Sequence, residues 1–230
     1  MKNLLILLVL LVLSPELMEA QDQEKDRDQD HTRLMMVDGN LLQIKDREQT
    51  QLKDKVTLND GTVLSPNGRY VTRDGKKMRL RDGEFMDMDG IGYNNEYQYR
   101  FKVMQENKGL SQDQMRERNQ NRTQFVVMDG NVYRIRSHEQ SRLQEQMTLN
   151  NGMMVNPDGT YMDRDQKQQR LRDGECLTMN GQKYQDGLQQ RKMLMHKSMS
   201  AHQNMNKSQK QQKVQKNVQV KTPPKKKGKN

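Results

Sequence analysis

Residues 56–90 read VTLNDGTVLSPNGRYVTRDGKKMRLRDGEFMDMDG, and they recur at residues 147–181 as MTLNNGMMVNPDGTYMDRDQKQQRLRDGECLTMNG. The two copies align without a gap at an offset of 91 residues, so that Gly61 matches Gly152. The match extends back to Asp38 in the first copy. Because a duplication of this kind defines the structural unit, every other feature of the chain is interpreted around it.

Glycines that follow Asp or Asn recur every seven or eight residues in the first copy. These pairs are Asp60-Gly61, Asn67-Gly68, Asp74-Gly75, Asp82-Gly83 and Asp89-Gly90. Such pairs tolerate the positive φ that tight hairpin turns require. Between them apolar residues alternate, as at Val56 and Leu58, which is the period of a strand. The sequence predicts a mostly β fold, in which each copy is an antiparallel meander of strands about five residues long. An earlier hairpin is expected across Asp38-Gly39.

The second copy departs from the first at one turn, where Gln166 replaces Gly75. We expect that turn to open, or that edge of the second copy to be more solvated. Each copy holds few apolar side chains to offset the entropy lost when its chain is ordered. The copies are therefore predicted to pack on each other, on the intervening helix or on a partner.

The most regular part of each copy has the form T-L-x-[ND]-G-x-x-[VL]-x-P-[ND]-G, at residues 57–68 and 148–159. The run LRDGE follows it, at residues 80–84 and 171–175. In these motifs and in its Met-rich strands, the chain resembles a domain of unknown function found in secreted proteins of Bacteroidetes. The resemblance covers both copies, roughly half of the chain, and implies no activity or catalytic residue.

Residues 1–20 have the features of a secretory signal peptide. Lys2 precedes ten consecutive apolar residues at 4–13, and Ala20 provides a small residue before the expected cleavage site. The apolar run is shorter than the roughly 20 residues that a membrane-spanning helix needs. We expect the mature chain to begin at Gln21, to be periplasmic or secreted, and to have no stable membrane span. An uncleaved anchor is the alternative.

Two polar segments separate the structured parts. Residues 21–33 are acidic and are expected to be disordered. Residues 93–124 join the first copy, at 34–92, to the second copy, at 125–183. In this linker Tyr97, Tyr99, Phe101 and Val103 could prolong a strand, and Ser111 is a candidate N-cap for a polar helix or flexible spacer over residues 111–122.

The C-terminal part of the chain is strongly basic. Residues 182–230 contain thirteen Lys and Arg against one acid, a net charge of +12, whereas the whole chain carries +10. We expect a Met- and His-containing helix at 184–208 and a disordered basic tail at 209–230. Such a tail either binds an anionic envelope surface or envelope protein, or only aids solubility. Nucleic acid is not expected as a partner, because the chain has a signal peptide and its tail lacks interleaved aromatic residues.

Catalytic motifs are not evident. None of the four histidines recurs at an equivalent position in the other copy, and the sequence lacks a nucleophile elbow, a phosphate-binding loop and zinc-type Cys/His spacing. The single cysteine, Cys176, lies on an expected strand, where a small buried residue or a thiol that links two chains are the two interpretations. We therefore expect a protein that is not an enzyme and needs no cofactor.

Methionine is enriched, with 19 residues. If residues 184–208 are helical, Met195, Met199 and His202 share one face, and thioether and imidazole groups suit Cu(I) or silver. The same face could instead dock on the second copy, extended by Leu188. The main hypothesis is an exported, non-enzymatic structural or interaction protein with a basic tail. The alternative is a periplasmic copper- or silver-binding protein that uses Met195, Met199 and His202.

Overall fold

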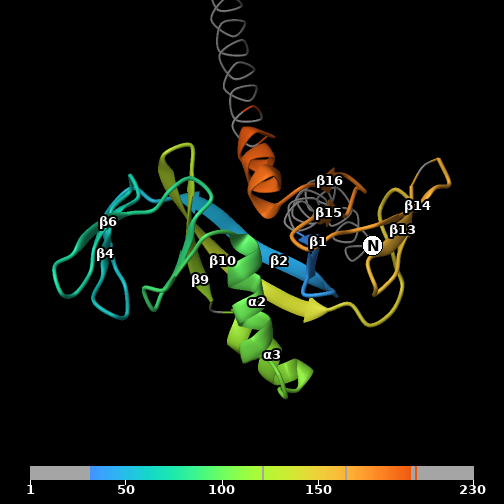
Figure 1. Ribbon diagram of the computed structural model, residues 1–230, viewed down its shortest axis with the longest axis horizontal. Coiled ribbons are helices and arrows are strands. Elements are labelled where there is room, and N and C mark those ends of the chain that lie inside the picture. The colour runs from blue at the N-terminus through green and yellow to red at the C-terminus, as the bar shows by residue number, and fades with distance from the viewer. Residues whose placement is uncertain (1–31, 121, 164, 198–199, 201–230) are drawn as a thin grey trace, which may run out of the picture. The chain divides into compact units, whose positions relative to one another are not determined.

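The computed structural model describes residues 32–120, 122–163, 165–197 and 200 (Figure 1). The chain divides at Gln190 into two compact units. The first unit holds both copies of the repeat, and the described residues of the second unit, 191–197 and 200, are helical. The predicted signal peptide, residues 21–31 of the acidic segment and the basic tail lie outside the described residues. The last two residues of the acidic segment, Thr32 and Arg33, are not disordered as expected, because they begin the first strand and are buried.

Each copy begins with a long antiparallel hairpin. Strand β1 (Thr32–Val37) pairs with β2 (Asn40–Gln51), and β9 (Thr123–Met128) pairs with β10 (Asn131–Arg142). At the first turn φ is 50° for Asp38 and 68° for the glycine after it, so both central residues are left-handed, as a type I′ turn requires. The prediction of a hairpin across Asp38-Gly39 is confirmed.

A four-stranded meander follows in each copy, as the turn spacing predicts. The first small sheet consists of β3 (Val56–Thr57), β4 (Val63–Leu64), β5 (Arg69–Val71) and β6 (Lys77–Arg79). The second small sheet consists of β11 (Met147–Thr148), β12 (Met154–Val155), β13 (Thr160–Met162) and β14 (Gln168–Arg170). These strands have two or three residues instead of the predicted five, because consecutive turns take up most of the chain between them.

The turn at residues 163–166 stays closed, contrary to one of the two expectations for Gln166. The amide of Gln166 donates to the carbonyl of Asp163 at 3.2 Å, as the amide of Gly75 donates to Thr72 at 2.8 Å in the first copy. Gln166 takes a left-handed φ of 60° to close the turn. A non-glycine residue in that conformation carries some backbone strain.

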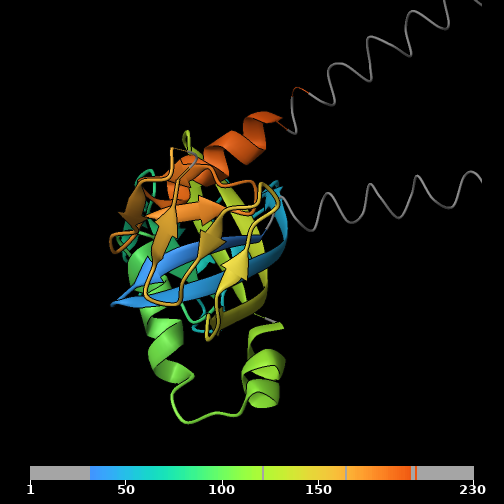
Figure 2. The same ribbon diagram turned by 90° about the vertical axis from the view of Figure 1, so that its right-hand side faces the viewer.

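Each copy ends in a short hairpin that pairs with the other copy. Strands β7 (Phe85–Asp87) and β8 (Gly92–Tyr93) join β9, whereas β15 (Cys176–Thr178) and β16 (Lys183–Tyr184) join β1. One sheet results, in the order β16-β15-β1-β2-β10-β9-β7-β8. Equivalent strands of the two copies stand at equal distances from its centre, and Figure 2 shows orange strands of the second copy beside the blue strands of the first.

One face of this sheet is covered by the two small sheets, and each small sheet packs on the long hairpin of the other copy. The first small sheet places Leu58, Leu64 and Leu80 against Phe125 and Val127 of the second copy. The second small sheet, in turn, covers residues of the first long hairpin. That core contains Leu34, Met36, Leu41, Leu149, Val155, Tyr161 and Leu171. The prediction that the copies pack on each other is therefore confirmed, and neither copy has a core of its own.

The opposite face carries the linker between the copies as two helices. Helix α2 (Glu96–Glu106) begins at the N-cap Asn95, whose side chain accepts from the amide of Gln98. Helix α3 (Gln112–Gln120) begins after Ser111, whose hydroxyl accepts from the amide of Gln114 at 3.3 Å, so the expected cap and helix are confirmed.

The expectation that α2 prolongs a strand is wrong. Tyr97 and Phe101 pack on the side of the core that contains Met35, whereas Tyr99 and Val103 are buried on another side of the helix. Each pair has helical spacing, and interleaving two such pairs produces the alternation of a strand.

Candidate functional site

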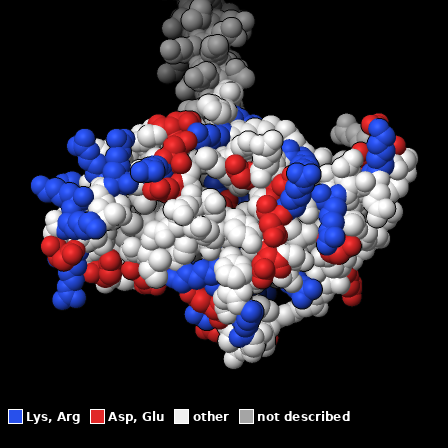
Figure 3. All heavy atoms as spheres, in the orientation of Figure 1, with Lys and Arg blue, Asp and Glu red and all other residues white. Residues whose placement is uncertain are grey.

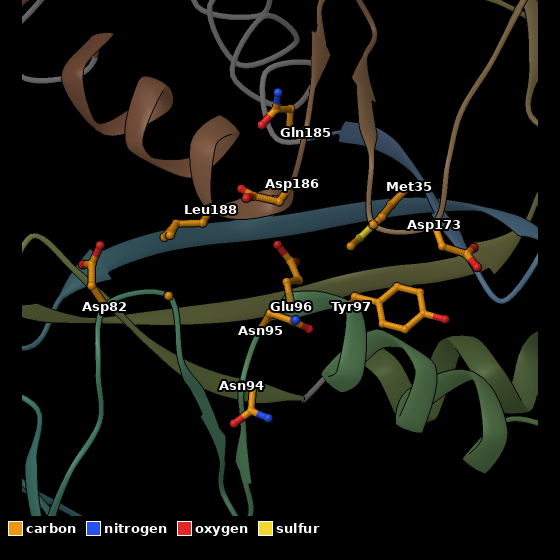
Figure 4. Close-up of a pocket in the computed structure, with 13 residues that line it drawn as sticks. Met35, Asp82, Asn94, Asn95, Glu96, Tyr97, Asp173, Gln185, Asp186 and Leu188 are labelled. Atoms are coloured by element: carbon orange, nitrogen blue, oxygen red, sulfur yellow. The ribbon is translucent and has the colours of Figure 1, made fainter.

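A cavity of about 450 Å³ lies between the two copies, where α2 begins (Figure 4). It is lined by equivalent residues of both copies, among them Asp82 with Asp173 and Asn95 with Asp186. Figure 4 shows Asp82 and Asp173 at opposite ends of the cavity. Its apolar part includes Met35. The cavity could hold a small cationic ligand only if the carboxylates that line it were free to bind that ligand.

The carboxylates at the cavity already stabilise the fold. Asp82 accepts from the amide of Asp129 at 2.6 Å, and Asp173 accepts from the amide of Gly39 at 3.2 Å. Each thus binds the first turn of the opposite copy. Asp186 accepts from the amide of Gln189 at 2.8 Å and caps the helical turn at 187–190. The geometry therefore assigns Asp82 and Asp173 to holding the two copies together and Asp186 to capping a helical turn.

The fourth acid, Glu96, belongs to a buried ion cluster between α2 and the sheet. It contacts Arg33 and, at 3.0 Å, Arg100. Asp46 accepts from the same two residues, at 2.9 Å from Arg33 and 3.2 Å from Arg100. All four side chains are at most 2% exposed. Two cations and two anions neutralise each other there, and the cluster fastens α2 to β1 and β2.

The pKa shifts agree with permanently charged arginines in this cluster. Burial lowers the pKa of Arg33, but the carboxylates of Glu96 and Asp46 raise it more, and the net shift is upward. The pKa of Arg100 is raised by the same balance, with Asp46 as the larger carboxylate effect. Both guanidinium groups therefore stay protonated, and neither can act as a general acid.

The second copy lacks this cluster. Gln124, Ser137 and Gly187 stand where the first copy has Arg33, Asp46 and Glu96. A Cβ atom on Gly187 would lie 2.0 Å from Oε2 of Glu96, so the glycine leaves room for that carboxylate. The cluster is therefore a single structural element and not a repeated site.

A second polar group surrounds Asp87, at the end of β7. Its carboxylate accepts from the hydroxyl of Tyr93 at 2.7 Å, from Nζ of Lys102 at 3.1 Å, and from the amides of Asp89 and Ile91, each at 3.0 Å. Burial is the largest cause that raises the pKa of the Tyr93 hydroxyl, which therefore stays protonated. Asp87 thus closes its own turn and binds α2, so its carboxylate has structural contacts.

The acids that recur in both copies have structural contacts. Glu84 and Glu175 each accept from the amide three residues before them, at 2.8 Å, and so close the turn of the LRDGE motif. Glu48 lies in β2 opposite Arg136, at 3.4 Å, and Glu139 lies in β10 opposite Lys45, at 3.1 Å. These last two stand in the long strands of the two copies.

The outer face of the first small sheet is basic. Arg69 and Arg79 are directly opposite each other on β5 and β6, and Val71 is opposite Lys77. All four side chains are exposed, and none of the three cations forms an ion pair with another described residue. Figure 3 shows Lys and Arg gathered at the left, over the sheet that contains β4 and β6. Like charges directly opposite each other in a sheet are destabilising.

The second small sheet has the opposite charge. Residues 53–84 carry eight basic and five acidic side chains, a net charge of +3, whereas residues 144–175 carry four basic and six acidic ones, a net charge of −2. Thr160 and Gln168 replace Arg69 and Lys77. The part of the chain outside the tail is near neutral as a whole, yet it contains two small sheets of unlike charge.

The predicted metal ligands are not brought together within the described residues. Met195 lies in the helical segment 191–197, whereas Met199 and His202 lie outside the described part of the chain. No three His, Cys, Asp or Glu side chains form a metal-binding group among the residues that were searched, 32–197 with short gaps and 200. The copper or silver site remains a prediction. Cys176 is buried in β15, as the structural interpretation expects.

Of the two features that the sequence analysis missed, the basic pair could have been found from the sequence and the buried ion cluster could not. The basic pair on β5 and β6 follows from the turn at Asp74-Gly75, which fixes the register and places Arg69 opposite Arg79. The buried ion cluster joins Arg33 to residues 13 and 63 positions away, and no local pattern indicates such a pairing.

Comparison with known proteins agrees with the duplication. The family model described as "Domain of unknown function (DUF6799)" matches residues 31–91 and again residues 122–182. No curated protein and no solved structure matches the chain. None of the described helices is long and apolar enough to cross a membrane. With both matches together spanning more than half of its length, the chain belongs to the DUF6799 family and carries two copies of that domain.

Proposed function

We propose that the protein is an exported, non-enzymatic structural or interaction protein of the periplasm or cell envelope, and that it contacts anionic envelope components. The observation that supports this most is the way the two copies differ. They share most of their turns and core residues, but residues 53–84 carry a net charge of +3 and the equivalent residues 144–175 carry −2. Divergence of the surface on a constant scaffold is what an interaction protein requires, because partners are recognised at exposed side chains.

The use of the buried polar groups supports the same proposal. The four ions of the cluster around Arg33 neutralise each other, and the acids at the central cavity bind turns. These groups hold the scaffold rigid. The groups left to meet a partner are therefore those on the surface, among them the exposed cations on β5 and β6.

The charge of the C-terminal segment supports the same proposal. Residues 182–230 carry a net charge of +12, and a short basic segment attracts anionic surfaces in a salt-dependent manner. The signal peptide predicted at residues 1–20 directs such a protein to the compartment that contains these surfaces.

Binding to isolated envelope material tests the proposal. We expect the purified protein to cosediment with envelope fragments at low salt and to be released at high salt, and removal of residues 209–230 to weaken the binding. Envelope binding that neither salt nor this deletion changes would contradict the proposal. N-terminal sequencing of the protein from cells should return Gln21, and a sequence that began at Met1 would refute export by a cleaved signal.

A further inference from the structure

The hairpin formed by β5 and β6 combines cations and an exposed apolar side chain on one surface. Residues 69–79 contain five basic side chains and a single acid, Asp74, a net charge of +4. Val71 is 37% exposed and lies between the cations, whereas Met78 is opposite Tyr70 and lies on the other face of the hairpin. We propose that this hairpin of the first copy is a docking site for an anionic lipid bilayer, a proposal that rests on the proposed function.

The register of the hairpin determines which side chains meet the bilayer. Directly opposite residues share a face, so Arg69, Val71, Lys77 and Arg79 form one surface. Tyr70 points to the other face, where it packs against the core of the first small sheet. The outer surface therefore presents three cations around one aliphatic side chain.

Protection of a sheet edge does not explain this charge. Lysine on an edge strand prevents pairing with another chain, and Lys77 on β6 serves that purpose. Arg69, however, lies on β5, which has neighbours on both sides and needs no such protection. Its position opposite Arg79 adds repulsion, which binding of an anionic surface would relieve.

The exposed apolar side chain among the cations favours a bilayer over a soluble polyanion. A polymer of phosphate or carboxylate groups offers no apolar contact to Val71. The interface of a bilayer offers both anionic headgroups and an acyl boundary into which small apolar groups can insert. A surface of this composition therefore fits a lipid bilayer best.

The second copy supplies a matched control in the same chain. Its hairpin at residues 160–170 has the same strands and turn but a net charge of only +1, because Thr160, Asp163 and Gln168 replace Arg69, Thr72 and Lys77. The triple variant Arg69→Thr, Thr72→Asp and Lys77→Gln gives the first hairpin the residues of the second at these three positions, and with them its net charge of +1. These residues are known to fit this fold, so the variant is expected to fold.

Vesicle binding by the full-length protein tests the assignment. The probes are vesicles of neutral phosphatidylcholine alone and vesicles that also contain anionic phosphatidylglycerol, at low and high salt. Each basic residue near an anionic surface changes partitioning by about fivefold, so the triple variant should bind anionic vesicles about a hundredfold more weakly. The reverse variant, Thr160→Arg, Asp163→Thr and Gln168→Lys, should bind them more tightly. A dye attached at Val71→Cys should shift to shorter emission wavelengths on anionic vesicles, whereas a dye at Met162→Cys should not.

The outcomes separate this inference from the proposed function. Equal binding of the triple variant and the unmodified protein to anionic vesicles would overturn the hairpin assignment. Binding to a soluble polyphosphate but not to anionic vesicles would overturn the assignment of a bilayer as the ligand. A soluble anionic partner would then be the remaining interpretation of the hairpin. Failure to bind vesicles, polyphosphate and envelope fragments alike would overturn both proposals.

Discussion

The buried ion cluster gives the sharpest prediction about stability. Asp46 accepts from Arg33 at 2.9 Å and from Arg100 at 3.2 Å, and its side chain is 2% exposed. In the variant Asp46→Asn one amide oxygen remains, and the NH₂ group must face a guanidinium donor. Two arginines then share only Glu96, which leaves one positive charge uncompensated in the protein interior.

Removing one partner of a buried ion pair costs about 3–5 kcal/mol. For a domain of this size each kcal/mol lowers the melting temperature by about 2–4 °C, so the variant should melt about 6–20 °C lower. Urea denaturation followed by circular dichroism measures the free energy of unfolding directly. Loss of α2 from the sheet would accompany the change.

Two further variants serve as controls for Asp46→Asn. Glu48→Gln on the same strand removes exposed ion pairs to Arg134 and Arg136, and it should cost at most about 1 kcal/mol. The double variant Arg33→Gln with Asp46→Asn restores charge balance and should be more stable than Asp46→Asn alone. A loss below about 1 kcal/mol for Asp46→Asn, or no recovery in the double variant, would refute the assignment of a structural ion cluster.

Further variants test other parts of the structure. Gly187→Ala should destabilise the protein, although alanine is normally the better helix former, because its Cβ would lie 2.0 Å from Oε2 of Glu96; a rise in melting temperature would contradict this. Hydrogen bonds from Thr62 lower the pKa of Asp60, so its contribution to stability is present above about pH 4 and is lost as the pH falls through the folded-state pKa. Asp60→Asn, which copies Asn151, should make acid unfolding less steep, and an unchanged pH profile would argue against the shift. An isolated fragment of residues 34–92 should not unfold as cooperatively or at as high a temperature as the whole chain, because its core residues lie in the other copy. Calorimetry with Cu(I) should show heat that is absent in the variant Met193→Leu, Met195→Leu, Met199→Leu if the methionine site exists, and equal heats would end that alternative.

Turn chemistry made the hairpins and meanders predictable from the sequence. Each Asp-Gly or Asn-Gly pair fixes one turn, and a turn fixes the register of the strands on either side. The glycines at 61, 68, 75, 83 and 90 all adopt positive φ in the structure. The same local information does not say which copy a strand will join. The pairing of β7 with β9, and of β15 with β1, therefore could not be predicted.

The chemistry of the interior was also beyond local patterns. Helix α2 was mistaken for a strand because two of its sides are buried, so its apolar residues alternate. In the sequence Arg33 and Glu96 look like ordinary polar residues, because they come together only in the folded chain. Charge counts over the whole chain placed the basic excess in the tail and missed the difference between the two small sheets. That difference appears only when equivalent positions of the copies are compared.

Pairing of each copy's last hairpin with the other copy is the central claim, and nuclear Overhauser effects across the sheet test it most directly. In the monomeric, isotope-labelled protein we predict cross-strand contacts between Leu34 and Leu177 and between Phe125 and Met86, whose Cα atoms are partners in the sheet. Contacts of Leu177 with Phe125 and of Met86 with Leu34 would show instead that each copy folds on itself, and would contradict the account.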